Sequence, residues 1–205
     1  NVVRFLLEDF KKSTISFPES PENLESGKTI EPLDPLPHQN KAIDDICKGL
    51  RETDRGQVHM ACGTGKTNTM LYLQEKLDSE SVLILVPSLN LVAQTLREWS
   101  KNAKIPFCWL CVCSDKTVSN NKDENDYAIK NISEMSFAVT SDIKEIERFM
   151  KSKGKKVIIS TYQSSKLISI AQQNFKTHAF DIAFADEAHR CAGRVSNAFG
   201  SILDE

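Results

Sequence analysis

The sequence contains no long hydrophobic run: none of its apolar stretches approaches the roughly 18 residues that suggest a membrane-spanning helix. Excess positive charge is also absent, because 26 lysines and arginines stand against 28 acidic residues, for a formal net charge of −2. Any binding to nucleic acid therefore needs a local basic surface. Residues 1–13 lack an initiator Met and show no apolar core followed by a cleavage site. We therefore expect no signal peptide and no membrane partner, and we interpret the chain as part of a longer polypeptide.

The six cysteines do not follow a zinc-finger pattern. Cys108, Cys111 and Cys113 lie close together, but no second pair of ligands follows at a suitable spacing. A metal site therefore stays open as an alternative, while the apolar residues between these cysteines favour small hydrophobic side chains in a buried strand. Nothing in the sequence points to secretion, so we expect reduced thiols and a cytoplasmic location.

Proline is concentrated at the start of the chain, where five of the seven prolines fall within residues 1–37. This region shows no sustained periodicity, so we expect residues 1–36 to be an extension or linker. Residues 37–205 are expected to form one folded domain.

Within residues 37–205, strand and helix patterns alternate. Apolar stretches predict strands at residues 57–61, 82–86, 107–113, 156–160 and 181–185, and helical periodicity predicts helices between them. Repeated β–α units predict an α/β fold in which helices flank a parallel sheet. The polar stretch 114–134 is expected to be a surface loop.

A glycine-rich motif stands between a predicted strand and a predicted helix: Gly63-Thr64-Gly65-Lys66-Thr67. Glycines allow a tight turn whose N–H groups point at phosphate oxygens, and the following helix adds its positive N-terminal dipole. Lys66 can then reach the β and γ phosphates of ATP, and the Thr67 hydroxyl can bind Mg²⁺. The strict P-loop pattern asks for glycine where this chain has Met60. The motif therefore predicts an ATP site, against the alternative of a glycine-rich turn with an incidental lysine.

An acidic motif, Asp186-Glu187-Ala188-His189, follows the predicted strand 181–185 directly. Parallel sheets bind their ligands at the carboxyl ends of the strands, where an acidic pair suits a metal and a water. We expect Asp186 to hold Mg²⁺ through its water shell and Glu187 to deprotonate the attacking water. A solvated acidic loop is the alternative for either residue taken alone.

Taken in order, several segments resemble the first RecA-like domain of superfamily 2 DEAH-box helicases and translocases, over roughly residues 36–205: Pro37–Gln39, Gly63–Thr67, Val86–Ser88, Ser160–Tyr162 and Asp186–His189. Further details resemble the motors of restriction-modification enzymes, especially the single-chain type ISP enzymes, with types I and III as relatives: Val112–Asp115, Ser160–Ser165 and Asp186–Arg190. The resemblance implies a P-loop RecA-like three-layer domain, hydrolysis of ATP with Mg²⁺, and movement on double-stranded DNA.

The resemblance also implies roles for single residues. Gln39 lies where the family reads adenine, and an amide can donate to and accept from the adenine edge; a surface glutamine is the alternative. Ser88 and Thr161 match positions that contact the nucleic-acid backbone, and helix capping is equally open for both. His189 matches a catalytic position between the nucleotide and the nucleic-acid cleft. Cys62 lies in the phosphate loop, so we expect thiol reagents to inhibit nucleotide binding. The alternative is that Cys62 is only a small residue that fits the loop.

A motor of this kind closes ATP between two RecA-like domains, and the second domain supplies arginines. No such domain is found within residues 1–205. We therefore expect this piece to bind Mg·ATP weakly and to hydrolyse it slowly. The resemblance also implies a nuclease and a methyltransferase as further parts of the full protein.

Three other functions are alternatives to a DNA motor. A P-loop kinase or metabolic NTPase would share the glycine motif but gives no reason for Asp186–His189 or for Gln39. A scaffold without chemistry would be expected to lose Lys66 or Glu187, and both are present. An RNA helicase would share all of these motifs.

Overall fold

The computed structural model describes residues 31–114, 138–175 and 179–188 of the 205. The chain divides into two compact units, Asn1–Glu31 and Pro32–Glu205, and the second unit contains the described helices and strands. The expected loop 114–134 lies outside the described residues except for Ser114, as do His189 and most of the expected extension 1–36. Within the described ranges, no helix has the length and apolar character to cross a membrane.

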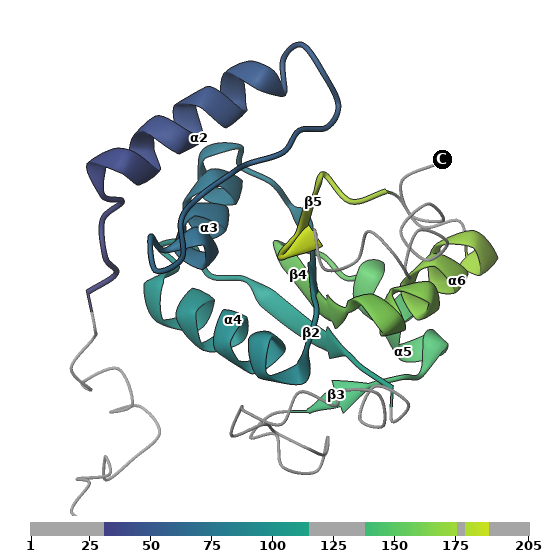
Figure 1. The fold of residues 1–205 in the computed structure, drawn as a ribbon. Helices are drawn as coiled ribbons and strands as arrows, with labels where there is room; N and C mark the ends of the chain where they lie inside the picture. Colours follow the sequence, from purple (N-terminus) through teal and green to yellow (C-terminus); the bar gives the residue numbers. More distant parts are fainter. Residues whose placement is uncertain (1–30, 115–137, 176–178, 189–205) are drawn as a thin grey trace, which may run out of the picture. The chain divides into compact units, whose positions relative to one another are not determined.

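The centre of this unit is a parallel sheet (Figure 1). Its order is β3-β2-β4-β1-β5, and every pairing is parallel. The strands are β1 Ser81–Val86, β2 Cys108–Val112, β3 Val139–Thr140, β4 Lys156–Thr161 and β5 Ile182–Ala185. The predicted α/β fold with a parallel sheet is therefore confirmed.

Helices cover both faces of the sheet. They are α2 Pro37–Gly49, α3 Lys66–Lys76, α4 Leu89–Asn102, α5 Ile143–Met150, the 3₁₀ turn η4 Tyr162–Ser164, and α6 Ser165–Phe175. Successive strand residues point to opposite faces, so Val82, Ile84 and Val86 of β1 pack in one hydrophobic cluster with residues of α2, α3 and α4. Leu83 and Leu85 pack in the other cluster with residues of α5 and α6.

One predicted strand is wrong. Residues 57–61 form no strand and pair with nothing in the described sheet. The polar residues Gln57 and His59 interrupt this stretch, and the Val58 side chain is 51% exposed. β1, in contrast, is a nearly continuous apolar run, and helices bury both faces of β1 and of β4. A short apolar run is therefore weak evidence of a strand, and here the glycine motif follows an irregular segment.

The cysteines in β2 and directly after it differ from one another. Cys108 is exposed, whereas Cys111 and Cys113 are buried, and burial raises the thiol pKa of Cys113 to about 11. No cluster of three or more potential metal ligands occurs among the described residues. The prediction of small buried side chains therefore fits Cys111 and Cys113 but not Cys108.

Candidate functional site

The glycine motif forms a tight loop at the start of α3. Gly63 and Gly65 have φ angles of +77° and +78°, in the left-handed region that favours glycine. Thr64 closes the turn, since its hydroxyl donates to the carbonyl oxygen of Ala61 at 2.7 Å. Gly65 is the N-cap of α3, so Lys66 begins a helix whose first N–H groups have no partner within the helix. This arrangement suits an anion such as a phosphate.

The start of α2 packs against this loop. The buried Gln39 amide donates from Nε2 to the carbonyl oxygens of Thr64 at 3.3 Å and Gly65 at 3.2 Å. Its Oε1 accepts from the Leu36 N–H at 2.8 Å, so both ends of the amide contact the chain's own backbone. His38 Nε2 donates to the Thr64 carbonyl at 3.0 Å. Sequence reasoning did not single out His38, although it adjoins Gln39 at the start of α2.

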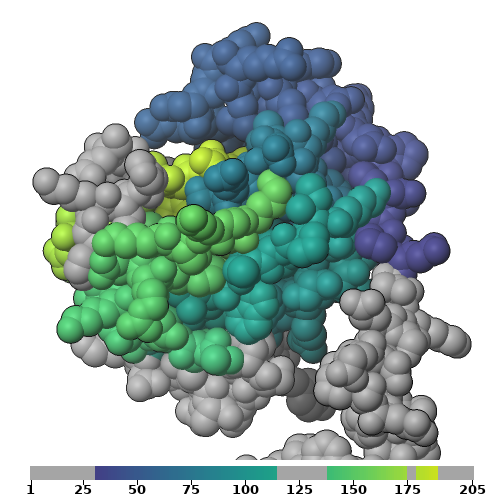
Figure 2. Space-filling model, turned by 180° about the vertical axis from the view of Figure 1, so that it is seen from behind, coloured from purple at the N-terminus to yellow at the C-terminus, as the bar shows by residue number. Residues whose placement is uncertain are grey.

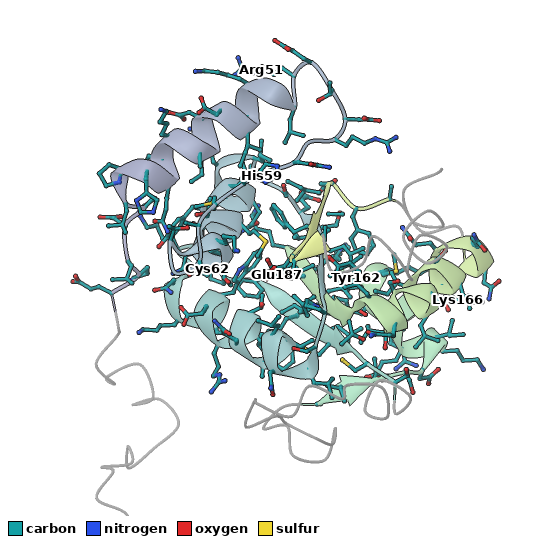
Figure 3. The ribbon with its side chains drawn as sticks, viewed as in Figure 1. Arg51, His59, Cys62, Tyr162, Lys166 and Glu187 are labelled. Atoms are coloured by element: carbon teal, nitrogen blue, oxygen red, sulfur yellow. The ribbon has the colours of Figure 1, made fainter. Side chains whose placement is uncertain are left out.

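The acidic motif lies against the glycine loop. Lys66 Nζ and Glu187 Oε1 form an ion pair at 3.2 Å, which joins two motifs 121 residues apart. Glu187 is labelled in Figure 3, at the end of β5. Asp186 extends β5 by donating its N–H to the Leu85 carbonyl at 2.9 Å. Glu187 has a φ angle of +53°, which is unusual for a residue with a side chain, and its N–H donates to Asp186 Oδ1 at 3.0 Å.

The charges of the site are coupled. Burial raises the pKa of the Asp186 carboxyl, and the neighbouring Glu187 charge raises it further, while Lys66 lowers it. The pKa of Lys66 is raised, chiefly by its hydrogen bond to Glu187. The site therefore holds two adjacent carboxylates and one lysine, and a further positive charge near Asp186 would stabilise it.

Two aromatic side chains hold the backbone of the site. The Tyr162 hydroxyl donates to the Asp186 carbonyl oxygen at 2.7 Å, and Trp99 Nε1 donates to the Thr67 carbonyl oxygen at 3.0 Å. Both side chains are buried in the hydrophobic clusters. Sequence reasoning missed both roles, because an aromatic residue in an apolar pattern gives no sign that its polar atom reaches a distant segment.

The two residues expected to contact nucleic acid make local contacts in this structure. Ser88 is the N-cap of α4, and its Oγ accepts from the Leu91 N–H at 3.4 Å. Thr161 is fully buried, and its hydroxyl donates to Ser164 Oγ at 3.1 Å. Both lie at the carboxyl ends of β1 and β4, the edge at which Asp186 follows β5, but neither contacts the ion pair.

The parallel sheet, the glycine loop and the acidic pair at the strand ends define a helicase-type ATPase domain. The chain belongs to the family of the Type III restriction enzyme, res subunit, whose model matches residues 32–204. The resemblance to superfamily 2 restriction motors is thereby confirmed.

Two solved structures are similar to this chain at 30% sequence identity. A nuclease-deletion mutant of the type ISP restriction-modification enzyme LlaGI, in complex with a DNA substrate mimic, matches with a TM-score of 0.61 over 77% of this chain and 15% of that chain. The ATP-dependent type ISP enzyme LlaBIII, bound to DNA, matches with a TM-score of 0.64 over 80% of this chain and 11% of that chain.

Curated relatives are also similar over most of this chain. Probable helicases from two strains of African swine fever virus are 28% identical over 157 residues, which is 76% of this chain. The match covers 16% of the viral proteins, so this chain corresponds to about a sixth of their length.

Proposed function

We propose that this chain is the ATP-binding motor domain of a DNA translocase in a restriction-modification enzyme, with residues 37–205 as the first RecA-like domain and residues 1–36 as an extension. The observation that carries the proposal is the ion pair between Lys66 and Glu187, which joins the glycine loop to the acidic motif at 3.2 Å. A P-loop kinase would explain the loop but gives no reason for an Asp-Glu pair against its lysine.

In this proposal the ATP phosphates lie over the loop. Lys66 would exchange the Glu187 carboxylate for the β and γ phosphates, and the N–H groups at Cys62–Gly65 would face the phosphate oxygens. Gln39 lies against the loop and would also line the adenine side of the site. Lys66 and Glu187 would therefore pair with each other only while no nucleotide is bound.

Release of Glu187 from Lys66 would allow it to act as the base for hydrolysis. The water oxygen would bond to the γ phosphorus, and the bond from that phosphorus to the β–γ bridging oxygen would break. The water proton would pass to Glu187, and ADP and inorganic phosphate would leave. His189, which lies outside the described residues, is proposed to link this step to the nucleic acid.

The residues of the site fit Mg²⁺. Asp186, whose pKa is raised by burial and by the Glu187 charge, is a carboxylate that a cation would stabilise. Together with the Thr67 hydroxyl it supplies the oxygen ligands that Mg²⁺ prefers, the rest being water and phosphate. When bound, Mg²⁺ would offset the negative charge of the phosphates.

DNA is the proposed track, and the second RecA-like domain, a nuclease and a methyltransferase are proposed parts of the full protein. Ser88 and Thr161 are proposed to contact the DNA backbone at the carboxyl edge of the sheet. Thr161 would have to become accessible first, because it is fully buried here. Without arginines from a second domain, residues 1–205 alone should hydrolyse ATP about 10³–10⁵-fold more slowly than the whole motor.

The proposal is tested by ATP hydrolysis of the full-length protein with duplex DNA, with single-stranded RNA and without nucleic acid. We expect stimulation by DNA and a loss of about 10²–10⁴-fold in Glu187→Gln. Glu52→Gln, which makes the same change at an exposed position, should leave the rate unchanged. Hydrolysis that ignores DNA would point to a metabolic NTPase, stimulation by RNA alone to an RNA helicase, and no ATP binding to a scaffold.

A further inference from the structure

A basic region of the described structure shares no residue with the Lys66–Glu187 pair. Residues 144–156 carry six basic side chains, of which Lys155 pairs with Asp78, and two acidic ones. Their net charge is +4, whereas the whole chain carries −2. The rest of the chain therefore carries −6. α5 and the turn into β4 form this region, on the face seen in green in Figure 2.

Helical spacing gathers the basic residues of α5 on one side. Lys144, Arg148 and Lys151 stand at positions i, i+4 and i+7, which lie within one arc of a helix. The apolar residues Ile146 and Phe149 pack instead in the hydrophobic cluster shared with α6. The basic arc is therefore turned away from the core.

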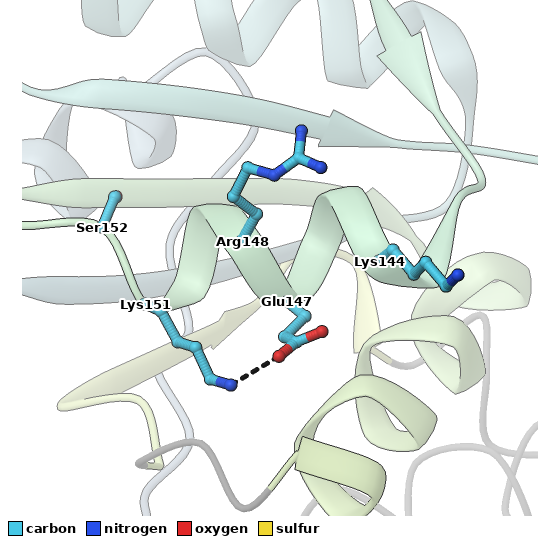
Figure 4. A pocket seen from close by; sticks show the side chains of 5 residues that line it. All are labelled: Lys144, Glu147, Arg148, Lys151 and Ser152. Atoms are coloured by element: carbon cyan, nitrogen blue, oxygen red, sulfur yellow. Dashed lines mark hydrogen bonds and ion pairs between the residues drawn. The ribbon is translucent and has the colours of Figure 1, made fainter.

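These side chains surround an open hollow of about 630 Å³, together with Glu147 and Ser152 (Figure 4). Lys151 pairs with Glu147. Lys144, Arg148 and the exposed Lys153 beyond the helix form no ion pair with any residue that the structure describes. Their charges are therefore available to a partner.

We propose that Lys144, Arg148, Lys151 and Lys153, the α5 basic surface, bind the phosphate backbone of duplex DNA independently of base sequence. This inference rests on the proposed motor function and adds a contact that involves neither Ser88 nor Thr161. The i to i+7 arc spans roughly 10 Å along the helix, at about 1.5 Å per residue. One DNA strand presents a phosphate every 3.4 Å or so of duplex axis, so this span matches about three phosphates.

The chemistry of the surface favours a polyphosphate over an acidic protein. Protein interfaces depend on buried aromatic or aliphatic anchors. The exposed large hydrophobic residues of the described structure are Leu33, Leu36, Val58, Leu77 and Trp109, and none belongs to α5 or to the turn after it. A surface of flexible cations without an apolar anchor suits a regularly charged backbone, which lysine and arginine contact without reading bases.

The test measures binding of the 205-residue chain to a labelled duplex by fluorescence anisotropy, from about 50 to about 200 mM salt. The variant carries Lys144→Gln, Arg148→Gln and Lys153→Gln. Loss of three phosphate contacts should weaken binding roughly tenfold or more and lower the slope of log K against log salt by about 2 to 3. The control carries Lys48→Gln, Arg51→Gln and Lys101→Gln, which remove the same charge from exposed positions elsewhere.

Equal binding by the two variants, or no binding of DNA by the unmodified chain, would overturn the proposal that the α5 basic surface binds DNA. Tighter binding of a polyglutamate chain than of the duplex, lost in the α5 variant, would assign the surface to an acidic protein and also overturn it. Mg·ATP affinity is measured on the same samples and should be unchanged in both variants. An unmodified chain that binds no Mg·ATP would instead contradict the motor function, so the two failures are distinguishable.

Discussion

The Tyr162 hydroxyl donates a 2.7 Å hydrogen bond to the carbonyl oxygen of Asp186. Tyr162 follows β4 directly and is buried in the cluster with α6, while Asp186 follows β5. The bond therefore ties the segment after one strand to the acidic motif after another. It holds the peptide that precedes Glu187, whose backbone is left-handed.

Tyr162→Phe removes this bond and keeps the ring. We expect a loss of about 0.5–1.5 kcal/mol in the free energy of unfolding. In the full-length enzyme, kcat for ATP should fall while the affinity for Mg·ATP stays the same, because the position of Glu187 is affected and the phosphate loop is not. Tyr72→Phe is the matched control, since the Tyr72 hydroxyl donates to the Leu33 carbonyl, away from the acidic motif. Equal effects of the two changes on kcat would contradict this role.

The two left-handed glycines of the loop should differ in their tolerance of a side chain. Alanine at Gly63 or Gly65 adopts a φ angle that costs about 1–2 kcal/mol. At Gly65 the added Cβ would also lie 2.5 Å from Gln39 Nε2, whereas at Gly63 nothing lies within 4 Å. Gly65→Ala should therefore destabilise the chain more than Gly63→Ala in urea denaturation. In a Gln39→Ala background the difference should vanish; if it persists, Gln39 is not its cause.

Asp186→Asn should stabilise the nucleotide-free chain at neutral pH. Burial and the Glu187 charge hold the pKa of Asp186 above its ordinary value. The native chain therefore keeps the proton on the Asp186 carboxyl to a higher pH than the unfolded chain does. Above the raised pKa the ionised carboxylate destabilises the fold, and this destabilisation disappears as pH falls through the raised pKa. The melting temperature of Asp186→Asn should exceed that of the unmodified chain by a margin that shrinks toward acid pH. The exposed Asp54→Asn should show no such trend, and stabilisation by Mg·ATP should be lost only in Asp186→Asn.

Asp181 should stabilise the start of β5 with the opposite pH dependence. Its Oδ2 accepts from the backbone N–H groups of Glu80 and Ser81, both at 2.8 Å. Burial alone would raise its pKa, but these hydrogen bonds hold the pKa below the ordinary value. The stabilisation is therefore present above the unfolded-state pKa and is lost as pH falls through the lowered one. Asp181→Ala should lower the free energy of unfolding by about 1–2 kcal/mol near neutral pH, less than the loss of a buried pair because Asp181 is exposed. A loss that does not change toward acid pH would refute this role.

Alkylation of Cys62 should weaken binding of Mg·ATP, because this exposed thiol lies in the loop proposed to bind the phosphates and a bulky adduct would occupy that proposed site. The measurement compares ATP affinity before and after thiol modification in Cys62→Ser and in Cys108→Ser, which removes the other exposed cysteine of the described chain. Only the chain that retains Cys62 should lose affinity. Equal losses in both variants would assign the effect to another thiol.

The amino-acid sequence predicted the fold class, because strand and helix patterns alternate along it and β1 is an apolar run of a kind that burial on both faces explains. It failed at residues 57–61, where the apolar run is too short and interrupted, and at β3, whose two residues show no periodicity. It also singled out Lys66, Asp186 and Glu187, because a glycine loop and an acidic pair at a strand end are local patterns.

The contacts that connect these patterns come from the packing of the folded chain. Lys66 contacts Glu187 because β5 pairs with β1 in parallel, which places the carboxyl end of β5 near the start of α3. Tyr162 reaches Asp186, and Gln39 fills the space that a side chain at Gly65 would need, through contacts between segments 24 to 26 residues apart. Local spacing predicts residue types and secondary structure, but a hydrogen bond between distant segments depends on the packing of whole strands and helices.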